Sequence, residues 1–145
     1  KNKKLQGKIG VKLKKANFYN YLTNFYHIKE KFIQGKEYIA YFLVLDYQPY
    51  LLIVSRKKRL LDILGNGFLD LYHFAPINIP QDIIKKLYWI SKKIIDFLEI
   101  RYGPLIFEFI RRGKEIFLLE AIPDFGGEYI ADFVIPNIYS VDIFE

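Results

Sequence analysis

Two glutamates in the last third of the sequence interrupt segments that are otherwise apolar. Glu108 lies in the segment 105–110, Glu120 ends the segment 115–120, and the polar residues 111–114 between them have the length of a hairpin connection. If the two segments pair as strands, the carboxylates lie near each other at the end of the hairpin away from the turn. Neighbouring carboxylates repel, and Mg²⁺ that also binds phosphate oxygens relieves the repulsion. The alternative is a pair of solvent-facing glutamates at a sheet edge.

A second acidic pair, Glu30 and Glu37, flanks Gly35 just before a segment rich in aromatic and β-branched residues. Where a chain enters a sheet in this way, backbone groups can hydrogen-bond a purine edge, and a glutamate can accept hydrogen bonds from ribose hydroxyls. The same pattern also fits a solvated turn.

Four consecutive cations follow a predicted strand: Arg56, Lys57, Lys58 and Arg59. We expect them to open a glycine-containing loop, where they fit a clamp for a phosphate or carboxylate beside a nucleotide. A solvated loop is the alternative.

The elements that must position these residues are strands with few helices. Segments 38–45 and 50–55 predict an antiparallel hairpin with a proline-containing turn at 46–49. Residues 81–98 predict a helix, because their apolar residues fall on one broad face.

Upstream of this hairpin, the pattern predicts a strand over 9–13 and a helix over 17–26. The chain as a whole predicts an α+β fold, an antiparallel sheet with packed helices, in a single domain over residues 1–145.

Composition limits the chemistry further. The 145 residues are 52% apolar and include no cysteine and two histidines, which excludes thiolate zinc sites and cysteine nucleophiles and favours a hard cation on carboxylates. No apolar run is long enough to cross a bilayer and no secretory signal is evident, so a cytoplasmic protein without a membrane partner is expected. The net charge of +6 and the 18% aromatic content keep a nucleic-acid-binding domain as an alternative, although the basic residues form no single stripe.

Three segments together resemble the ATP-grasp family. Residues 30–38 (EKFIQGKEY) resemble the segment that joins the family's two nucleotide-holding lobes, and residues 107–128 (FEFIRRGKEIFLLEAIPDFGGE) resemble its magnesium hairpin. Residues 7–11 (GKIGV) are similar to the tail of its phosphate-covering glycine loop. The motifs occur in the family's order along nearly the whole chain, and the resemblance is to the C-terminal part of the ATP-grasp fold.

The resemblance implies ATP and Mg²⁺ as cofactors. It places Glu30, Phe32 and Ile33 on the adenine side, Glu37 on the ribose, and Lys1 and Lys8 among the nucleotide contacts. Glu108 and Glu120 take the metal positions, and Arg56 and Arg59 of the cationic run are the expected catalytic residues. The implied activity is that of an ATP-dependent ligase, in which a small carboxylate substrate is converted to an acyl phosphate and coupled to an amine or thiol.

Two departures qualify this expectation. Ile122 stands where active relatives commonly have an asparagine metal ligand, so a nucleotide-binding module that has lost catalysis is an alternative. The sequence also begins at Lys1 and lacks methionine, so we expect a fragment whose partner is the missing N-terminal portion of the same polypeptide, and we expect the fragment alone to be inactive.

Overall fold

The structure is a computed structural model and describes residues 31–59, 70–127, 129–140 and 142–143. Residues 31–34 belong to one unit of the chain, and Gly35–Glu145 form a second unit. The fold below is that of the second unit. The strand predicted over 9–13 and the helix predicted over 17–26 lie outside the described residues.

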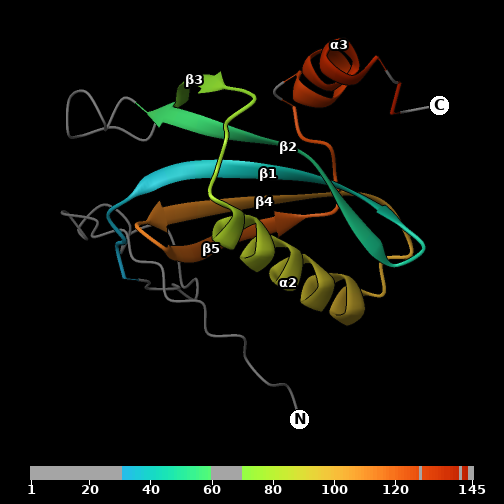
Figure 1. Cartoon of the computed structure of the whole chain (residues 1–145), viewed down its shortest axis with the longest axis horizontal. Helices are drawn as coiled ribbons and strands as arrows, with labels where there is room; N and C mark the ends of the chain where they lie inside the picture. The colour runs from blue at the N-terminus through green and yellow to red at the C-terminus, as the bar shows by residue number, and fades with distance from the viewer. Residues whose placement is uncertain (1–30, 60–69, 128, 141, 144–145) are drawn as a thin grey trace, which may run out of the picture. The chain divides into compact units, whose positions relative to one another are not determined.

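The described part of the second unit contains one antiparallel sheet of five strands, in the order β3-β2-β1-β4-β5 (Figure 1). The middle strand, β1, is buried on both faces, which explains why its sequence reads as a continuous apolar run. The strands are β1 (Lys36–Leu45), β2 (Gln48–Arg59), β3 (Asp70–Phe74), β4 (Tyr102–Arg112) and β5 (Glu115–Ile122).

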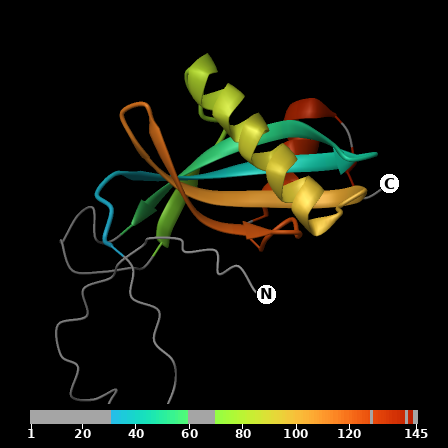
Figure 2. The same ribbon diagram turned by 90° about the horizontal axis from the view of Figure 1, so that it is seen from below.

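Helices cover both faces of the sheet (Figure 2). On one face lies α2 (Gln81–Leu98), the helix that the sequence predicts. Its residues Ile83, Leu87 and Ile95 are fully buried at multiples of four positions, as expected for one apolar helix face. On the other face lie the short π-helical turn η2 (Ile130–Val134) and the short helix α3 (Ile135–Tyr139), neither of which was predicted.

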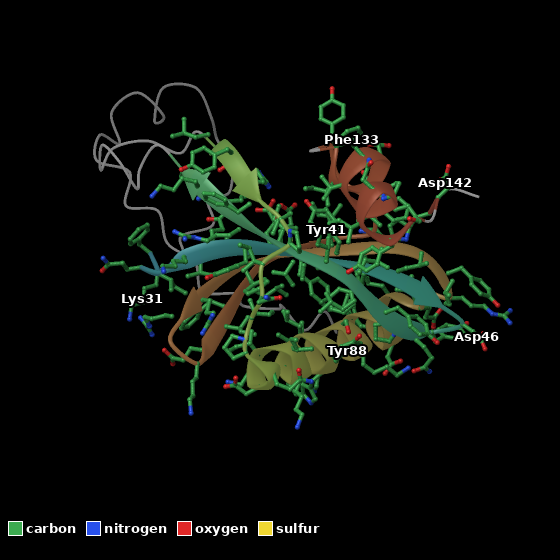
Figure 3. The ribbon with its side chains drawn as sticks, turned by 45° about the horizontal axis from the view of Figure 1, so that its top comes forward. Lys31, Tyr41, Asp46, Tyr88, Phe133 and Asp142 are labelled. Atoms are coloured by element: carbon green, nitrogen blue, oxygen red, sulfur yellow. The ribbon has the colours of Figure 1, made fainter. Side chains whose placement is uncertain are left out.

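Alternation along β1 divides the core into two layers. Even-numbered residues such as Phe42 join the layer beneath α2, whereas Ile39 and Tyr41 join the layer on the η2 and α3 side. Figure 3 labels Tyr41 on β1 and Tyr88 on α2, which lie on these two opposite sides. Any polar side chain at an odd-numbered position of β1 therefore shares the face of η2 and α3.

The first hairpin is tighter than predicted. Asp46 and Tyr47 form a two-residue connection with φ of 47° and 63°, as a type I′ turn requires, and Pro49 pairs with Val44 within the strands. Pro49 is tolerated in β2 because the pairing with β3 begins only at Arg56. The prediction of a proline-containing turn over 46–49 was therefore wrong.

The run of four cations is strand and not loop. β2 continues through Arg59, and β3, which was not predicted, pairs with Arg56 to Arg59. The predicted strand end at Ser55 was wrong because a run of four cations is typical of a solvated loop, whereas here all four pair with β3 and Arg56 also pairs with β1.

The second hairpin agrees with the prediction and is longer. β4 and β5 are joined by Gly113 and Lys114, and Gly113 has a φ of 60°, as the first central position of a type II′ turn requires. The sheet with its packed helices confirms the predicted α+β class.

Candidate functional site

Five charged residues from four strands gather on the sheet face that carries η2 and α3. We call Glu37, Lys57, Arg59, Asp70 and Glu108 the charge cluster. Strand register brings them together: Glu108 pairs with Ile39 of β1, and Arg59 pairs with Asp70 of β3. Their positions are fixed by backbone pairing, so side-chain contacts between distant parts of the sequence follow from the sheet itself.

Lys57 lies at the centre of the charge cluster and is only 6% exposed. Its Nζ atom lies 2.6 Å from Glu108 Oε1, 3.2 Å from Asp70 Oδ2 and 4.0 Å from Glu37 Oε1. A buried ammonium is costly unless carboxylates compensate its lost hydration, and here three carboxylates from β1, β3 and β4 surround it.

Arg59 is the second cation of the charge cluster. Its guanidinium donates from Nη2 to Glu37 Oε1 and from Nε to Asp70 Oδ1 at 3.1 Å. Glu37 is 8% exposed, and this contact with Arg59 is its direct ionic hydrogen bond.

Burial and charge act against each other in the pKa values of these groups. Burial raises the pKa of Glu37 above its ordinary value, although Arg59 and Lys57 act in the opposite direction. Burial lowers the pKa of Lys57, but the hydrogen bonds and charges of Glu108 and Asp70 outweigh burial and raise it overall. Burial also acts to raise the pKa of Asp70, and the opposing effects of Lys57 and Arg59 lower it overall. The lysine and Asp70 are therefore stabilised in their charged forms.

Glu108 and Glu120 stand directly opposite each other on β4 and β5. Opposed residues of an antiparallel pair project to the same face with Cβ atoms about 4.5–5.5 Å apart, so both carboxylates point to the side of the charge cluster. Glu120 is exposed, whereas Glu108 is 18% exposed and bound to Lys57. The hairpin thus presents its two carboxylates together, as its sequence suggested.

Two one-residue irregularities decide which side chains reach this face. The register skips Leu119 between the pairs Glu108–Glu120 and Phe109–Leu118, and it skips Leu71 between Lys58–Tyr72 and Arg59–Asp70. If the same sequence paired without these irregularities, Leu119 would stand opposite Glu108 and Leu71 opposite Arg59. Each bulge therefore exchanges a leucine for a carboxylate on the charged face.

The cationic run is divided by strand alternation, which separates Arg56 from Arg59. Arg56 pairs with Tyr38, whose side chain belongs to the layer beneath α2, so Arg56 lies on the opposite face from the charge cluster. Arg59 does join the charge cluster, together with Glu37. Lys57, which the sequence interpretation left within a general clamp, and Asp70, which it missed, complete the group. Period-2 alternation continued from Ser55 through Arg59 would have separated these residues.

The remaining predicted nucleotide ligands lie outside the second unit. Phe32 is exposed and Ile33 is buried, and both belong to the unit that ends at Gln34. Lys1, Lys8 and Glu30 lie outside the described residues.

Two further polar atoms lie near the charge cluster on the same face. Ser55, fully buried on β2 two residues before Lys57, has no hydrogen-bond partner for Oγ among the described residues, and His73, opposite Lys57, has none for Nδ1. Buried polar atoms are normally satisfied, so these two favour a bound polar group at this face.

The donor set fits Mg²⁺ held together with phosphate. Among the described residues, no group of three or more histidines, cysteines, aspartates or glutamates forms a protein-only metal cage. Magnesium is usually held by one or two carboxylates plus substrate phosphates, which is what Glu108 and Glu120 offer. The contact between the Lys57 ammonium and Glu108 shows that this carboxylate binds a cation in the folded chain.

Comparison with known proteins supports the fold. No protein-family model and no curated protein matches the chain. Similar solved structures are phosphoribosylglycinamide synthetase from Anaerococcus prevotii (22% identity, TM-score 0.62, 81% of this chain), L-amino acid ligase from Bacillus licheniformis (18%, 0.59, 74%), and a biotin carboxylase complex with β-γ-ATP from Campylobacter jejuni (16%, 0.59, 79%).

These three proteins are ATP-grasp ligases, so the chain has the fold of part of an ATP-grasp ligase, as its motifs suggested. At these identities, the similarity establishes the fold alone. The chain covers 30%, 27% and 24% of the three solved chains, respectively. In the described part of the chain, no helix is both long and apolar enough to span a bilayer.

Proposed function

We propose that the charged face of this sheet belongs to the Mg-ATP site of an ATP-dependent ligase. The single observation that carries the proposal is the opposed pair Glu108 and Glu120, held beside Lys57 on the sheet of an ATP-grasp fold. The solved biotin carboxylase of this fold is a complex with a nucleotide, which supports the same use of the fold here.

In this proposal, Glu108 and Glu120 hold Mg²⁺, which when bound neutralises charge on the nucleotide phosphates. Phosphoryl transfer requires mainly positioning and charge neutralisation, so the residues that matter are cations and carboxylates and not a strong base. Arg59 is the cation we assign to the phosphates, because its two-sided contact with Glu37 and Asp70 holds its guanidinium on this face.

We assign Glu37 to the nucleotide ribose. Arg59 contacts Oε1 of the buried Glu37, and a carboxylate has further acceptor sites, so Glu37 can accept a ribose hydroxyl while it keeps this contact. The two assignments are therefore linked, because Glu37 also holds the guanidinium that we assign to the phosphates. Lys1, Lys8, Glu30, Phe32 and Ile33 remain predicted nucleotide ligands.

The proposed reaction is ATP-dependent phosphorylation of a small carboxylate, followed by displacement of phosphate by an amine or thiol. Calorimetric titration of Mg-ATP into the chain and into Glu108→Gln tests the binding step. ADP release with a panel of carboxylates, measured on the longer polypeptide that includes the expected N-terminal portion, tests the chemistry. Mg-ATP binding that is the same in the parent chain and in Glu108→Gln contradicts the metal assignment.

A second candidate is a nucleotide-binding module without catalysis. Ile122 packs in the core layer on the η2 and α3 side and offers no metal ligand at the position where the family commonly has asparagine. Mg-ATP binding without ADP release for any carboxylate favours this candidate.

A further inference from the structure

The charged face is short of cations. Four carboxylates, those of Glu37, Asp70, Glu108 and Glu120, share it with the side chains of Lys57 and Arg59. Carboxylates in such an excess attract a further cation or keep one carboxyl protonated. The single cation in contact with Glu108 is the ammonium of Lys57, within the part of the chain that the structure describes.

We infer that Lys57 competes with the divalent cation for Glu108 and must leave this carboxylate when the metal binds. The inference rests on the proposed function, because it assumes that Glu108 and Glu120 hold the metal. The ammonium lies 2.6 Å from Glu108 Oε1. A Mg²⁺ ion bound to the same oxygen at about 2.0–2.1 Å would need this space for its other ligands. Two cations at one carboxylate repel each other, so a metal that binds Glu108 Oε1 displaces the ammonium from this oxygen.

The displaced ammonium has two other carboxylates within reach. Asp70 Oδ2 already lies 3.2 Å from Nζ and Glu37 Oε1 lies 4.0 Å away, so Lys57 keeps carboxylate partners when it loses Glu108. When the metal binds, Lys57 can therefore stay in the charge cluster with Asp70 and Glu37 as partners, and it loses only the contact with Glu108.

This competition links the metal to the nucleotide. Without nucleotide, the metal gains only two carboxylates and must displace Lys57. With nucleotide, the phosphates supply further oxygen ligands and a new anionic partner for the cations of this face. Lys57 is thus a positioning residue that weakens binding of the metal alone and favours joint binding of metal and nucleotide.

The neighbouring lysine offers a matched control. Lys58 follows Lys57 in β2, and strand alternation turns it to the opposite face, opposite Tyr72 of β3. Lys57→Met and Lys58→Met therefore change net charge equally, and only the first removes the cation from Glu108.

Binding of Mn²⁺, measured by electron paramagnetic resonance of the free ion, tests the inference in the parent chain, Lys57→Met, Lys58→Met and Glu108→Gln. Without nucleotide, Lys57→Met should bind Mn²⁺ about tenfold more tightly than the parent, because a contact worth roughly 1.4 kcal/mol or more no longer has to be broken. Lys58→Met should match the parent. A non-hydrolysable ATP analogue should raise Mn²⁺ affinity less in Lys57→Met than in the parent.

The outcomes separate the two proposals. If Lys57→Met binds Mn²⁺ no more tightly than the parent while Glu108→Gln weakens binding with the ATP analogue, the competition is wrong and the metal site stands. If Glu108→Gln changes nothing, the metal site itself is wrong and the competition falls with it.

A measurement on the unaltered chain covers the case in which Lys57→Met does not fold. The ¹⁵N signal of the Lys57 ammonium should shift when Mg²⁺ and the ATP analogue are added together, because its partner changes. A ¹⁵N signal that stays in place while Mg²⁺ binds overturns the inference.

Discussion

The Nζ atom of Lys57 lies 2.6 Å from Oε1 of Glu108, although 51 positions separate the two residues in the chain. Both are in strands next to β1, on opposite sides of it, and their side chains meet over the face of β1 that carries Ile39. Glu120, directly opposite Glu108, is exposed. Without bound ligand, Glu108 is therefore part of an ion pair in the folded chain, whereas Glu120 is a surface residue.

Replacing each glutamate by glutamine should reveal this difference. Without metal and nucleotide, Glu108→Gln should lower the free energy of unfolding by about 1.5–3 kcal/mol, because it weakens a hydrogen bond between charged groups. Glu120→Gln should stay within about 0.5 kcal/mol of the parent, as is usual for surface changes. Urea denaturation followed by circular dichroism measures both, and equal losses would contradict the asymmetry. Both changes should weaken Mg-dependent nucleotide binding.

The two arginines of the cationic run should differ in nucleotide binding. Arg59→Met should weaken Mg-ATP binding by about tenfold or more, because charge-assisted hydrogen bonds to phosphate contribute about 1.5–3 kcal/mol. Arg56→Met removes the same charge from the opposite face and should leave the affinity within about twofold. Calorimetric titration compares the two variants, and an equal effect would show that the phosphates do not meet this face.

Glu37 should be required for nucleotide affinity and dispensable for folding. Glu37→Gln replaces a buried carboxyl group, whose pKa is raised chiefly by burial, with an uncharged amide of similar volume. Thermal unfolding should still be cooperative, while Mg-ATP binding falls because the amide is a weaker acceptor for ribose hydroxyls. Unchanged affinity would remove Glu37 from the nucleotide site.

Asp70 should make the stability of the chain fall with pH in acid. Lys57 and Arg59 outweigh burial and hold its pKa in the folded chain below the ordinary value of 3.8. Between the folded and unfolded pKa values the unfolded chain binds more protons, so stability rises with pH there and is lost as pH falls through the folded value. Asp70→Asn should therefore flatten the pH dependence below about pH 4. Asp46→Asn, at an exposed pair with Arg101, is the matched control.

Gly35 should be required for close packing. A Cβ added at Gly35 would overlap Ile110 Cγ2 and lie 2.8 Å from the Arg111 carbonyl oxygen. Gly35→Ala should therefore lower the free energy of unfolding by about 1–3 kcal/mol through overpacking. Gly127→Ala, where a Cβ would meet no atom within 4 Å, should cost much less. Equal stabilities in a denaturant titration would show that β4 moves aside freely.

Sequence reasoning found the elements with strong periodicity. The apolar face of residues 81–98 identified α2, and the two apolar segments around 111–114 identified the β4–β5 hairpin. It missed β3 and the end of β2, because Arg56 to Arg59 look like solvent-exposed loop until a neighbouring strand supplies partners for them. It assigned Glu37 to a nucleotide and predicted that Glu108 and Glu120 lie near each other. It could not predict that Lys57 contacts Glu37 and Glu108, since these contacts depend on the order of strands in the sheet.

The two skipped leucines have a consequence for how this site changes over generations. Because Leu119 and Leu71 are the extra residues of the two irregularities, deletion of either one would leave a regular ladder with the carboxylate still opposite Glu108 or Arg59. A homologue that keeps the leucine but pairs regularly would instead place that leucine opposite Glu108 or Arg59, with every acidic residue still in its sequence. The strand register, and not the acidic residues alone, therefore marks which homologues keep this arrangement.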